Sequence, residues 1–343
     1  MEYRTLGKTG KEISLLSFGC MRFPKDEQEA AALVSAAIDA GVNYFETSNG
    51  YCEKTSERKV GLGVKARRTE VLVSTKSGVK SDTDGDAMRR NVEASLEQLQ
   101  TDYLDFYQFW GLSWKTWQQA RIKGGALEAI RTLQDEGVIR HLGFTSHDTP
   151  ENVLKIMQTG EFESATLQYN IINVEMEQQI AYARQQGIGI VVMCPVAGGL
   201  LAGSSPKVRE MFPSAGNSSA SVDLALRFVW SNPGVATAPS GMERMSDLDE
   251  NLRSVEQFKP LDTGDRERAI EVSNEFAALG KKFCTTCRYC TPCPSKVWIP
   301  DVFKLVNHAR LYDLGESARA RYHSWPAASL ASACDECGEC EPK

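Results

Sequence analysis

The sequence predicts an α/β protein, a TIM (β/α)8 barrel that is preceded by a β-hairpin and followed by a small cysteine-rich module. Short apolar runs alternate eight times with amphipathic segments, the pattern of a closed parallel barrel. The 343 residues fit a barrel of roughly 250 residues plus a smaller module. Seven of the ten cysteines lie after residue 280. We therefore expect a barrel over residues 1–260, a linker helix over 261–280 and a module over 281–343.

The expected elements follow in order from the N-terminus. Residues 2–14 alternate weakly and predict the hairpin, and residues 15–19 predict the first barrel strand. A helix is expected over 26–40, because its apolar residues recur at helical spacing and Gly41 ends it. Each later strand is paired here with the helix that follows it: 42–46 with 54–66, 71–75 with 85–100, 104–109 with 125–137, 138–144 with 150–158, 164–168 with 175–186, 188–193 with 221–231, and 234–238 with 244–254.

A doubly wound open sheet is the alternative that the same alternation allows. No Gly-x-Gly-x-x-Gly motif follows the first strand, which makes that alternative weaker. The longest loop within the predicted barrel covers about residues 196–220 and is rich in Gly, Ser and Pro. A loop of this length indicates a lid or a binding loop, although a disordered segment would have the same composition.

Composition excludes some classes of partner. The chain has 42% apolar and 24% charged residues and a net charge of −6, without a basic cluster, which argues against nucleic acid or an anionic membrane surface. No apolar run approaches the roughly 20 residues of a membrane span. The N-terminal residues Met-Glu-Tyr-Arg do not resemble a signal peptide. We expect a cytoplasmic protein with a small-molecule substrate.

The stretch 42–51 carries the first candidate catalytic groups. It begins as a short apolar strand and ends in a polar loop that holds Glu46 and Tyr51. The next strand run ends at Lys76, and strand ends meet at the mouth of a barrel. A nearby ammonium would ease release of the tyrosine proton, and a carboxylate would orient that lysine. Tyr51, Lys76 and Glu46 are therefore expected to share a site.

Together with Tyr103-Leu-Asp-Phe-Tyr107 running into Trp110, these residues resemble the catalytic framework of the aldo-keto reductases. The resemblance implies an Asp, Tyr, Lys and His tetrad on a TIM barrel, a nicotinamide cofactor, and a hairpin that plugs the barrel bottom. Tyr51 and Lys76 match the tetrad, whereas Glu46 stands for its Asp and Trp110 for its His. An indole donates one N–H but carries no transferable proton. Trp110 then either closes a degenerate pocket or reshapes it for an enone or another activated double bond.

The same resemblance implies the residues that would hold the cofactor. Strand ends and the loops after them would contact the nicotinamide, and a glycine-bearing loop would approach the pyrophosphate. An arginine at the last helix start could hold a 2′-phosphate, which favours NADPH over NADH. The implied residues are Ser146, Gln168, Tyr169, Cys194, Gly198, Leu200, Gly241, Arg244 and Asn251. Cys20, Cys52 and Cys194 are expected to be packing residues, because no histidine-based activating pair is visible.

The C-terminal cysteines carry the strongest motif. The run from Cys284 to Pro294 reads C-x2-C-x2-C-x2-C-P, and a second run reads C-x2-C-x2-C. The first resembles the bacterial ferredoxin run, one residue short in its last gap, and predicts [4Fe–4S] ligation. A zinc ribbon is the structural alternative, because four thiolates also suit zinc. The candidate ligands are Cys284, Cys287, Cys290, Cys293, Cys334, Cys337 and Cys340.

Ligand counting allows one cluster or two. In two-cluster ferredoxins the cysteine before the proline serves the other cluster. By that rule Cys293 joins the three cysteines of the second run, and the three remaining thiols lack a fourth. Either a further cysteine follows Lys343 in a longer chain, or that cluster has three protein thiolates and an open iron. A barrel with such a tail resembles a subgroup of the aldo-keto reductases that carries a ferredoxin-like domain.

Three functions remain open from the sequence. The first is an NADPH-dependent oxidoreductase coupled to the clusters, with a possible electron-transfer partner. The second is a nicotinamide-binding redox sensor or electron-transfer protein with little carbonyl reductase activity. In the third, the clusters only staple the tail. Because a hydride carries two electrons and a cubane passes one, a direct relay would need a radical-capable group between them.

Overall fold

The computed structural model describes residues 1–79, 85–202, 205–211, 221–281 and 290–340. The chain divides into two compact units. The first consists of Met1–Tyr169, Glu175–Pro195 and Val229–Lys259. The second consists of Asn170–Val174, Val196–Phe228 and Pro260–Lys343.

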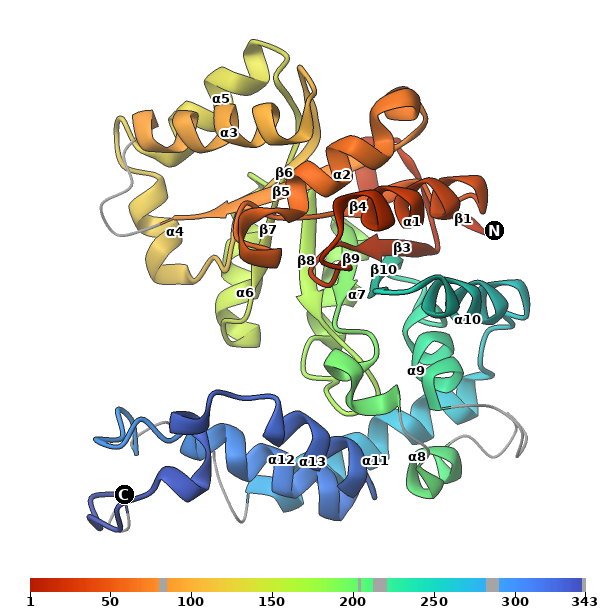
Figure 1. Cartoon of the computed structure of the whole chain (residues 1–343), viewed down its shortest axis with the longest axis vertical. Helices are drawn as coiled ribbons and strands as arrows, with labels where there is room; N and C mark the ends of the chain where they lie inside the picture. Colours follow the sequence, from red (N-terminus) through yellow and green to blue (C-terminus); the bar gives the residue numbers. More distant parts are fainter. Residues whose placement is uncertain (80–84, 203–204, 212–220, 282–289, 341–343) are drawn as a thin grey trace. The chain divides into compact units, whose positions relative to one another are not determined.

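Eight parallel strands form a closed barrel in the first unit, as the sequence predicts (Figure 1). They follow one another around the barrel in chain order, and the last pairs with the first. The strands are β3 (Leu16–Gly19), β4 (Tyr44–Glu46), β5 (Leu72–Gly78), β6 (Leu104–Trp110), β7 (Ile139–Ser146), β8 (Ser164–Gln168), β9 (Gly189–Met193) and β10 (Val235–Gly241). Closure of the ring excludes the doubly wound open sheet.

The predicted hairpin is also present. Strand β1 (Tyr3–Thr5) pairs antiparallel with β2 (Glu12–Ser14). Leu6 and Ile13 are fully buried and pack in one cluster with Tyr44 and Phe106, which lie in β4 and β6. The hairpin therefore fills the amino-terminal end of the barrel and leaves the carboxyl ends of the strands for a site.

Helices alternate with the strands. Those of the first unit are α1 (Glu27–Asp39), α2 (Ser56–Val64), α3 (Gly85–Leu99), α4 (Trp114–Ala120), α5 (Ala126–Asp135), α6 (Pro150–Gln158), α7 (Glu177–Gln186) and α10 (Met245–Glu256). Helix α9 (Ser221–Trp230) precedes β10 in the chain and belongs mostly to the second unit. Asp26 caps α1 by accepting from the backbone N–H groups of Gln28 and Glu29. Helix α4 was not predicted. It begins with a capping box in which Thr116 stands where Glu or Gln would give the usual signal.

The second unit is mainly helical. It contains α8 (Pro206–Glu210), α11 (Thr263–Lys281), α12 (Ile299–Leu311) and α13 (Gly315–His323), and α12 packs along α13 (Figure 1). Tyr312 is a centre of this packing: its ring meets Phe276 edge-on at 4.8 Å, and its carbonyl accepts from the hydroxyl of Ser205. The sequence indicated α11 as a linker helix but did not predict α12 and α13.

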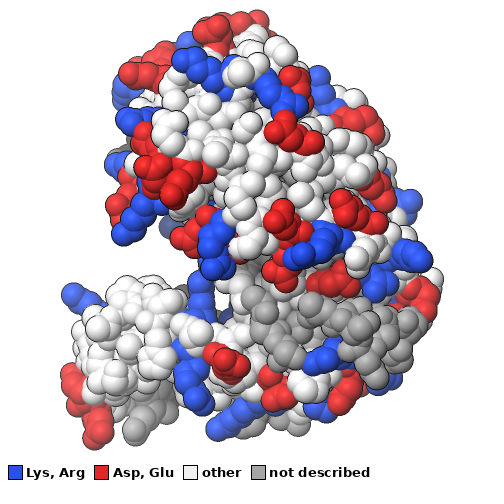
Figure 2. All heavy atoms as spheres, turned by 45° about the vertical axis from the view of Figure 1, so that its right-hand side comes forward, with Lys and Arg blue, Asp and Glu red and all other residues white. Residues whose placement is uncertain are grey.

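Charges on the described residues are mixed. On the face drawn in Figure 2, basic and acidic side chains are interspersed, and no broad patch of one sign stands out among them. Within the described residues, no helix combines the length and apolarity needed to cross a membrane.

Candidate functional site

A buried ion pair lies at the carboxyl ends of two neighbouring strands. Glu46 ends β4 and Lys76 lies in β5, and the register pairs Glu46 with Ser74. The Lys76 ammonium donates to the Glu46 carboxylate and, at 2.9 Å, to the carbonyl of Thr47. Only 2% of the lysine side chain and 8% of the glutamate side chain are exposed. The pair is thus shielded from water, and the carboxylate holds the lysine in the barrel mouth.

Tyr51 lies directly above this ion pair. Its backbone N–H donates to the carbonyl of Ser48 at 3.2 Å, which fixes a tight turn after β4. The Lys76 ammonium lies 4.6 Å from the centre of the phenol ring, and the Trp110 indole meets the ring edge-on at 5.6 Å. Tyr51, Lys76, Glu46 and Trp110, predicted from separate strand ends, therefore meet in one place.

The electrostatics of Tyr51 differ from the expectation. Burial raises the pKa of Tyr51 well above its usual value, and the nearby negative charge of Glu46 raises it further. Charge on the thiols of Cys194 and Cys20 acts in the same direction. The Lys76 ammonium donates to the Glu46 carboxylate and lies over the face of the phenol ring. The predicted easing of proton release is therefore absent from this arrangement.

The three cysteines near Tyr51 have different surroundings. Cys20 is fully buried, as expected of a packing residue, and burial raises the pKa of its thiol. Cys52 is half-buried, and its thiol faces the carbonyl of Met21 at 3.4 Å. Cys194 is exposed and follows β9 with a φ of 56°, so it is not a packing residue. Its left-handed backbone costs free energy in a residue other than glycine.

The candidate cofactor residues of β7 and β8 are mostly committed to protein contacts. Ser146 donates its hydroxyl to the carbonyl of Leu112 at 2.7 Å. Gln168 ends β8 and is half-buried. Tyr169 is fully buried, and its hydroxyl donates to the Glu177 carboxylate. In this structure the Tyr169 ring presents no exposed face on which a nicotinamide could stack.

The candidates near β10 surround its carboxyl end. Gly241 ends the strand and is exposed. The Arg244 side chain is 76% exposed and pairs with Asp247 at 3.2 Å. Asn251 is buried on α10, where it donates to the carbonyl of Asp247 and accepts from Ser240. Arg244 is thus the group of this set that is open to an anion in solution.

Gly198 and Leu200 belong to the second unit. They lie in the 3-10 segment Ala197–Ala202, where Gly198 has a φ of 67° and Leu200 is 4% exposed. A side chain at position 198 would meet no atom within 4 Å, so the glycine is required by its backbone conformation.

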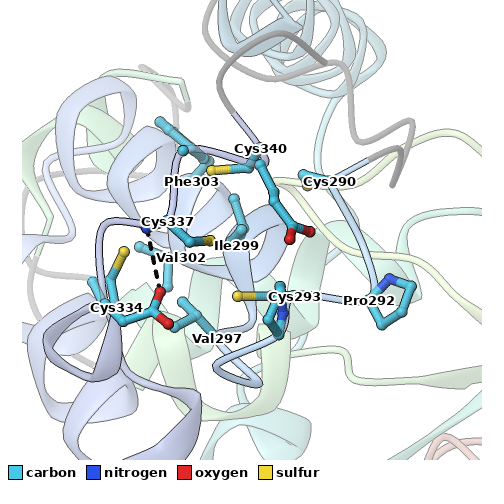
Figure 3. Close-up of a pocket in the computed structure, with 15 residues that line it drawn as sticks. Cys290, Pro292, Cys293, Val297, Ile299, Val302, Phe303, Cys334, Cys337 and Cys340 are labelled. Carbon is cyan, nitrogen blue, oxygen red and sulfur yellow. Dashed lines mark hydrogen bonds between the residues drawn. The ribbon is translucent and has the colours of Figure 1, made fainter.

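A cavity of about 220 Å³ lies in the cysteine module (Figure 3). Its apolar wall includes Val297, Ile299, Val302 and Phe303. Figure 3 shows the sulfur atoms of Cys293 and Cys337, which come from different segments, turned toward the same space. The five cysteines that line it are Cys290, Cys293, Cys334, Cys337 and Cys340.

Two further candidate ligands, Cys284 and Cys287, lie outside the described residues. Among the residues that are described, no three His, Cys, Asp or Glu side chains are close enough together to hold a single metal ion. The backbone N–H of Glu336 points at the Cys334 sulfur at 3.4 Å. The donor set therefore consists of thiols spread around an apolar space, with an amide directed at one of them.

Comparisons with known proteins agree on one family. The model of the aldo/keto reductase family matches residues 15–273. The L-galactose dehydrogenase of Arabidopsis thaliana is 28% identical over 302 residues, which cover 79% of this chain and 93% of that protein. The uncharacterized oxidoreductase YqkF of Bacillus subtilis is 25% identical over 287 residues, which cover 74% of this chain and 91% of that protein.

A solved structure agrees with these relatives. The holo form of an aldo-keto reductase from Bacillus halodurans matches with a TM-score of 0.70 and 27% identity, over 79% of this chain and 96% of that one. The family match ends at residue 273, so the cysteines from Cys284 onward lie beyond it.

Proposed function

Because the chain belongs to the aldo/keto reductase family, we propose that it is an NADPH-dependent reductase with an altered tetrad and iron–sulfur clusters. Membership makes it an NAD(P)H-dependent oxidoreductase of that family. The preference for NADPH, the altered tetrad and the clusters are the proposed part. The observation that carries the proposal is the meeting of four side chains at the barrel mouth, namely Glu46, Tyr51, Lys76 and Trp110.

Each of the four has a distinct role in this proposal. The nicotinamide, when bound, supplies a hydride. Tyr51 donates the proton that the reduced substrate atom needs, because its raised pKa keeps the phenol protonated. Lys76, held by Glu46, fixes the phenol ring from one side. Trp110 closes the other side and brings no imidazole to seat a carbonyl oxygen.

A non-standard substrate follows from these roles. Ordinary aldehydes gain from a second donor at the carbonyl oxygen, and oxyanion-type donors are typically worth orders of magnitude in rate. A site with a single donor suits a substrate that is already activated. An activated C=C bond conjugated to a carbonyl is such a substrate, and we propose this class.

The cofactor would lie along the carboxyl ends of the barrel strands. Arg244 is the exposed cation of the set, and its partner Asp247 would yield to a 2′-phosphate, which supports NADPH. The remaining proposed contacts are Ser146, Gln168, Tyr169, Cys194, Gly198, Leu200, Gly241 and Asn251. Tyr169 would have to change its surroundings to contact the nicotinamide, because it is fully buried.

The cysteine module would hold one or two [4Fe–4S] clusters. A single zinc ion binds four sulfurs at about 2.3 Å, and the thiols lining the cavity are not gathered that tightly. A cubane is larger and needs a space between its ligands, which the apolar cavity supplies. The proposed ligands are Cys284, Cys287, Cys290, Cys293, Cys334, Cys337 and Cys340. A cytoplasmic location and an electron-transfer partner are part of the same proposal, because clusters need reduced thiols.

Turnover of the Tyr51→Phe variant tests the barrel part of the proposal. NADPH oxidation is measured with an enone and with an aromatic aldehyde, in the wild type and in the variant. We expect enone reduction to exceed aldehyde reduction and to fall at least about 100-fold in Tyr51→Phe, because its general acid is lost. The control is Tyr44→Phe, which removes the hydroxyl of a fully buried tyrosine from the same strand region. Equal rates in wild type and Tyr51→Phe would reject the role of Tyr51.

A second function is favoured by one specific observation. The pKa of Tyr51 is raised and Lys76 is engaged by Glu46, so the site is poorly set for rapid proton exchange. A nicotinamide-binding redox sensor or electron-transfer protein would need only the binding site. Tight NADPH binding without turnover of either substrate would favour this alternative.

A further inference from the structure

Gly50 and Trp110 face each other beside the Tyr51 phenol. A Cβ atom added to Gly50 would lie 2.9 Å from Cζ3 and 3.0 Å from Cη2 of the Trp110 indole. The next atom, Oγ of Ser48, would be at an ordinary 3.9 Å. Gly50 does not have a positive φ, so its backbone conformation suits any residue. The indole is therefore the feature that requires glycine at this position.

The backbone that carries the indole is fixed. Trp110 ends β6, where it pairs in register with Gly78 of β5. The next two residues are tied to β7, because Gly111 donates to the Thr145 hydroxyl and Leu112 to the Thr145 carbonyl, both at 2.8 Å. Backbone bonds on both sides thus fix the position from which the Trp110 side chain reaches the turn that carries Gly50.

The same indole fixes the phenol. It meets the Tyr51 ring at an interplanar angle of 85°, while Lys76 occupies a position over the ring 4.6 Å from its centre. The turn below is held by the Gly50 N–H, which donates to the Ser48 hydroxyl at 3.2 Å. Displacements of about 1 Å in a catalytic group can cost about 100-fold in rate. A contact that sets the direction of the phenol therefore matters for proton transfer.

We propose that Trp110 and Gly50 form a coupled pair that positions Tyr51, and that Trp110 acts through the shape of its ring and not through its N–H. The role in catalysis rests on the proposed function, whereas the coupling of the two residues does not. Trp110 is then a positioning residue. Replacing it alone with histidine opens a gap beside Gly50, so the new imidazole gains little until position 50 is also filled.

A double-mutant cycle tests the coupling without any substrate. Thermal midpoints are measured for the wild type, Gly50→Ala, Trp110→His and the double variant. We expect Gly50→Ala to lower the midpoint by several degrees in the wild type and to leave it unchanged or raise it beside Trp110→His. Gly63→Ala is the matched control, since its Cβ would meet Val34 at 2.5 Å, and it should cost the same in both backgrounds. An equal cost of Gly50→Ala in both backgrounds overturns the pair.

Kinetics of the same variants, with Trp110→Phe added, test the positioning. Phenylalanine keeps an aromatic edge toward Tyr51 but lacks the indole N–H. We expect Trp110→Phe to lower kcat less than Trp110→His does, because phenylalanine keeps a larger aromatic edge, and Gly50→Ala alone to lower kcat at least about 10-fold with little change in KM. A loss of kcat in Trp110→Phe equal to or larger than that in Trp110→His, which keeps a ring N–H, would show that the aromatic edge does not position Tyr51, and overturns the proposal. If no variant turns over any probe, the proposed function fails, and the midpoints still decide whether the pair exists.

Discussion

At the scale of single residues, the Lys76 ammonium interacts both with an ion-pair partner and with the Tyr51 ring. Its ammonium donates to the Glu46 carboxylate and to the Thr47 carbonyl, and it also lies over the Tyr51 ring. The ion pair uses the charge that would otherwise favour a phenolate. Tyr51 therefore stays a neutral donor, and the lysine acts on the orientation of the phenol more than on its acidity.

The pH dependence of reduction follows from this arrangement. Burial and the Glu46 charge raise the pKa of Tyr51, so the protonated form persists to high pH. Because reduction uses the protonated phenol, kcat should show no alkaline fall below about pH 10, the usual pKa of tyrosine. The measurement is kcat against pH with saturating NADPH and an enone. A fall centred near pH 8 would mean that cofactor or substrate reverses the shift, and that Lys76 does lower this pKa.

Sequence patterns could locate these residues but not their environment. Strand ends converge in a parallel barrel, so the meeting of Glu46 and Lys76 follows from their places in two strands. The edge-on contact between Tyr51 and Trp110 depends on side-chain directions set by tertiary packing. The need for glycine at position 50 could not be predicted either, since the turn pattern Asn49-Gly50 explains it equally well from the sequence alone.

At the scale of elements, strands β5, β6 and β7 are joined by one buried carboxylate. Asp105 of β6 is 1% exposed and pairs with Arg68 and Arg140, each at 2.8 Å. Both guanidinium groups also lie over the Tyr103 ring, at 4.1 and 3.7 Å from its centre. The oxygen of Asp105 that pairs with Arg68 also accepts from the backbone N–H of Val73 in β5 at 3.0 Å. The carboxylate thus serves three strands at once.

Removal of this charge should destabilise the barrel. Asp105→Asn removes a buried charge and leaves Arg68, whose side chain is 12% exposed, without its ionic partner. We expect a loss of about 3 kcal/mol in the free energy of unfolding. Urea denaturation measures it. The control is Glu161→Gln. Glu161 forms an ion pair with Arg131 in which the glutamate side chain is 33% exposed and the arginine side chain 43% exposed. That change should cost less than about 1 kcal/mol. Similar losses in both variants would contradict the importance of the buried cluster.

Elements were predictable where one period dominated the sequence. The eight barrel strands and the hairpin lie where apolar runs and turn residues indicated them. Helix α4 could not be predicted from the sequence, because its seven residues include two tryptophans and show no clear apolar period. Helix α12 has Pro300 in its first turn, and a proline at this place is a helix-start signal in the sequence.

At the scale of the whole molecule, the proposed function combines two kinds of redox chemistry in one chain. The barrel belongs to a family that uses a two-electron nicotinamide, and five cysteines that we propose as ligands of one-electron clusters line the cavity of the cysteine module. The family match covers the first and ends before the second. The module is therefore the part of the chain whose chemistry must be measured directly.

Cluster ligation by the module makes a sharp prediction for Cys337. Thiolate ligation contributes much of the folding free energy of a small metal-binding module, so Cys337→Ser should lose iron and sulfide and loosen the second unit. Anaerobically purified protein is assayed for iron, sulfide, zinc and visible absorption, and limited proteolysis reports on the unit. Cys52→Ser is the matched control, because Cys52 lies beside Tyr51 in the barrel and not in the cavity. The Cys52→Ser variant should keep its iron.

Zinc in place of iron in the wild type, or unchanged iron in Cys337→Ser, would contradict the assignment. Reduction of the wild-type clusters by NADPH would then separate an electron-transfer role from a purely structural one, since clusters that only staple the module need not accept electrons from the cofactor.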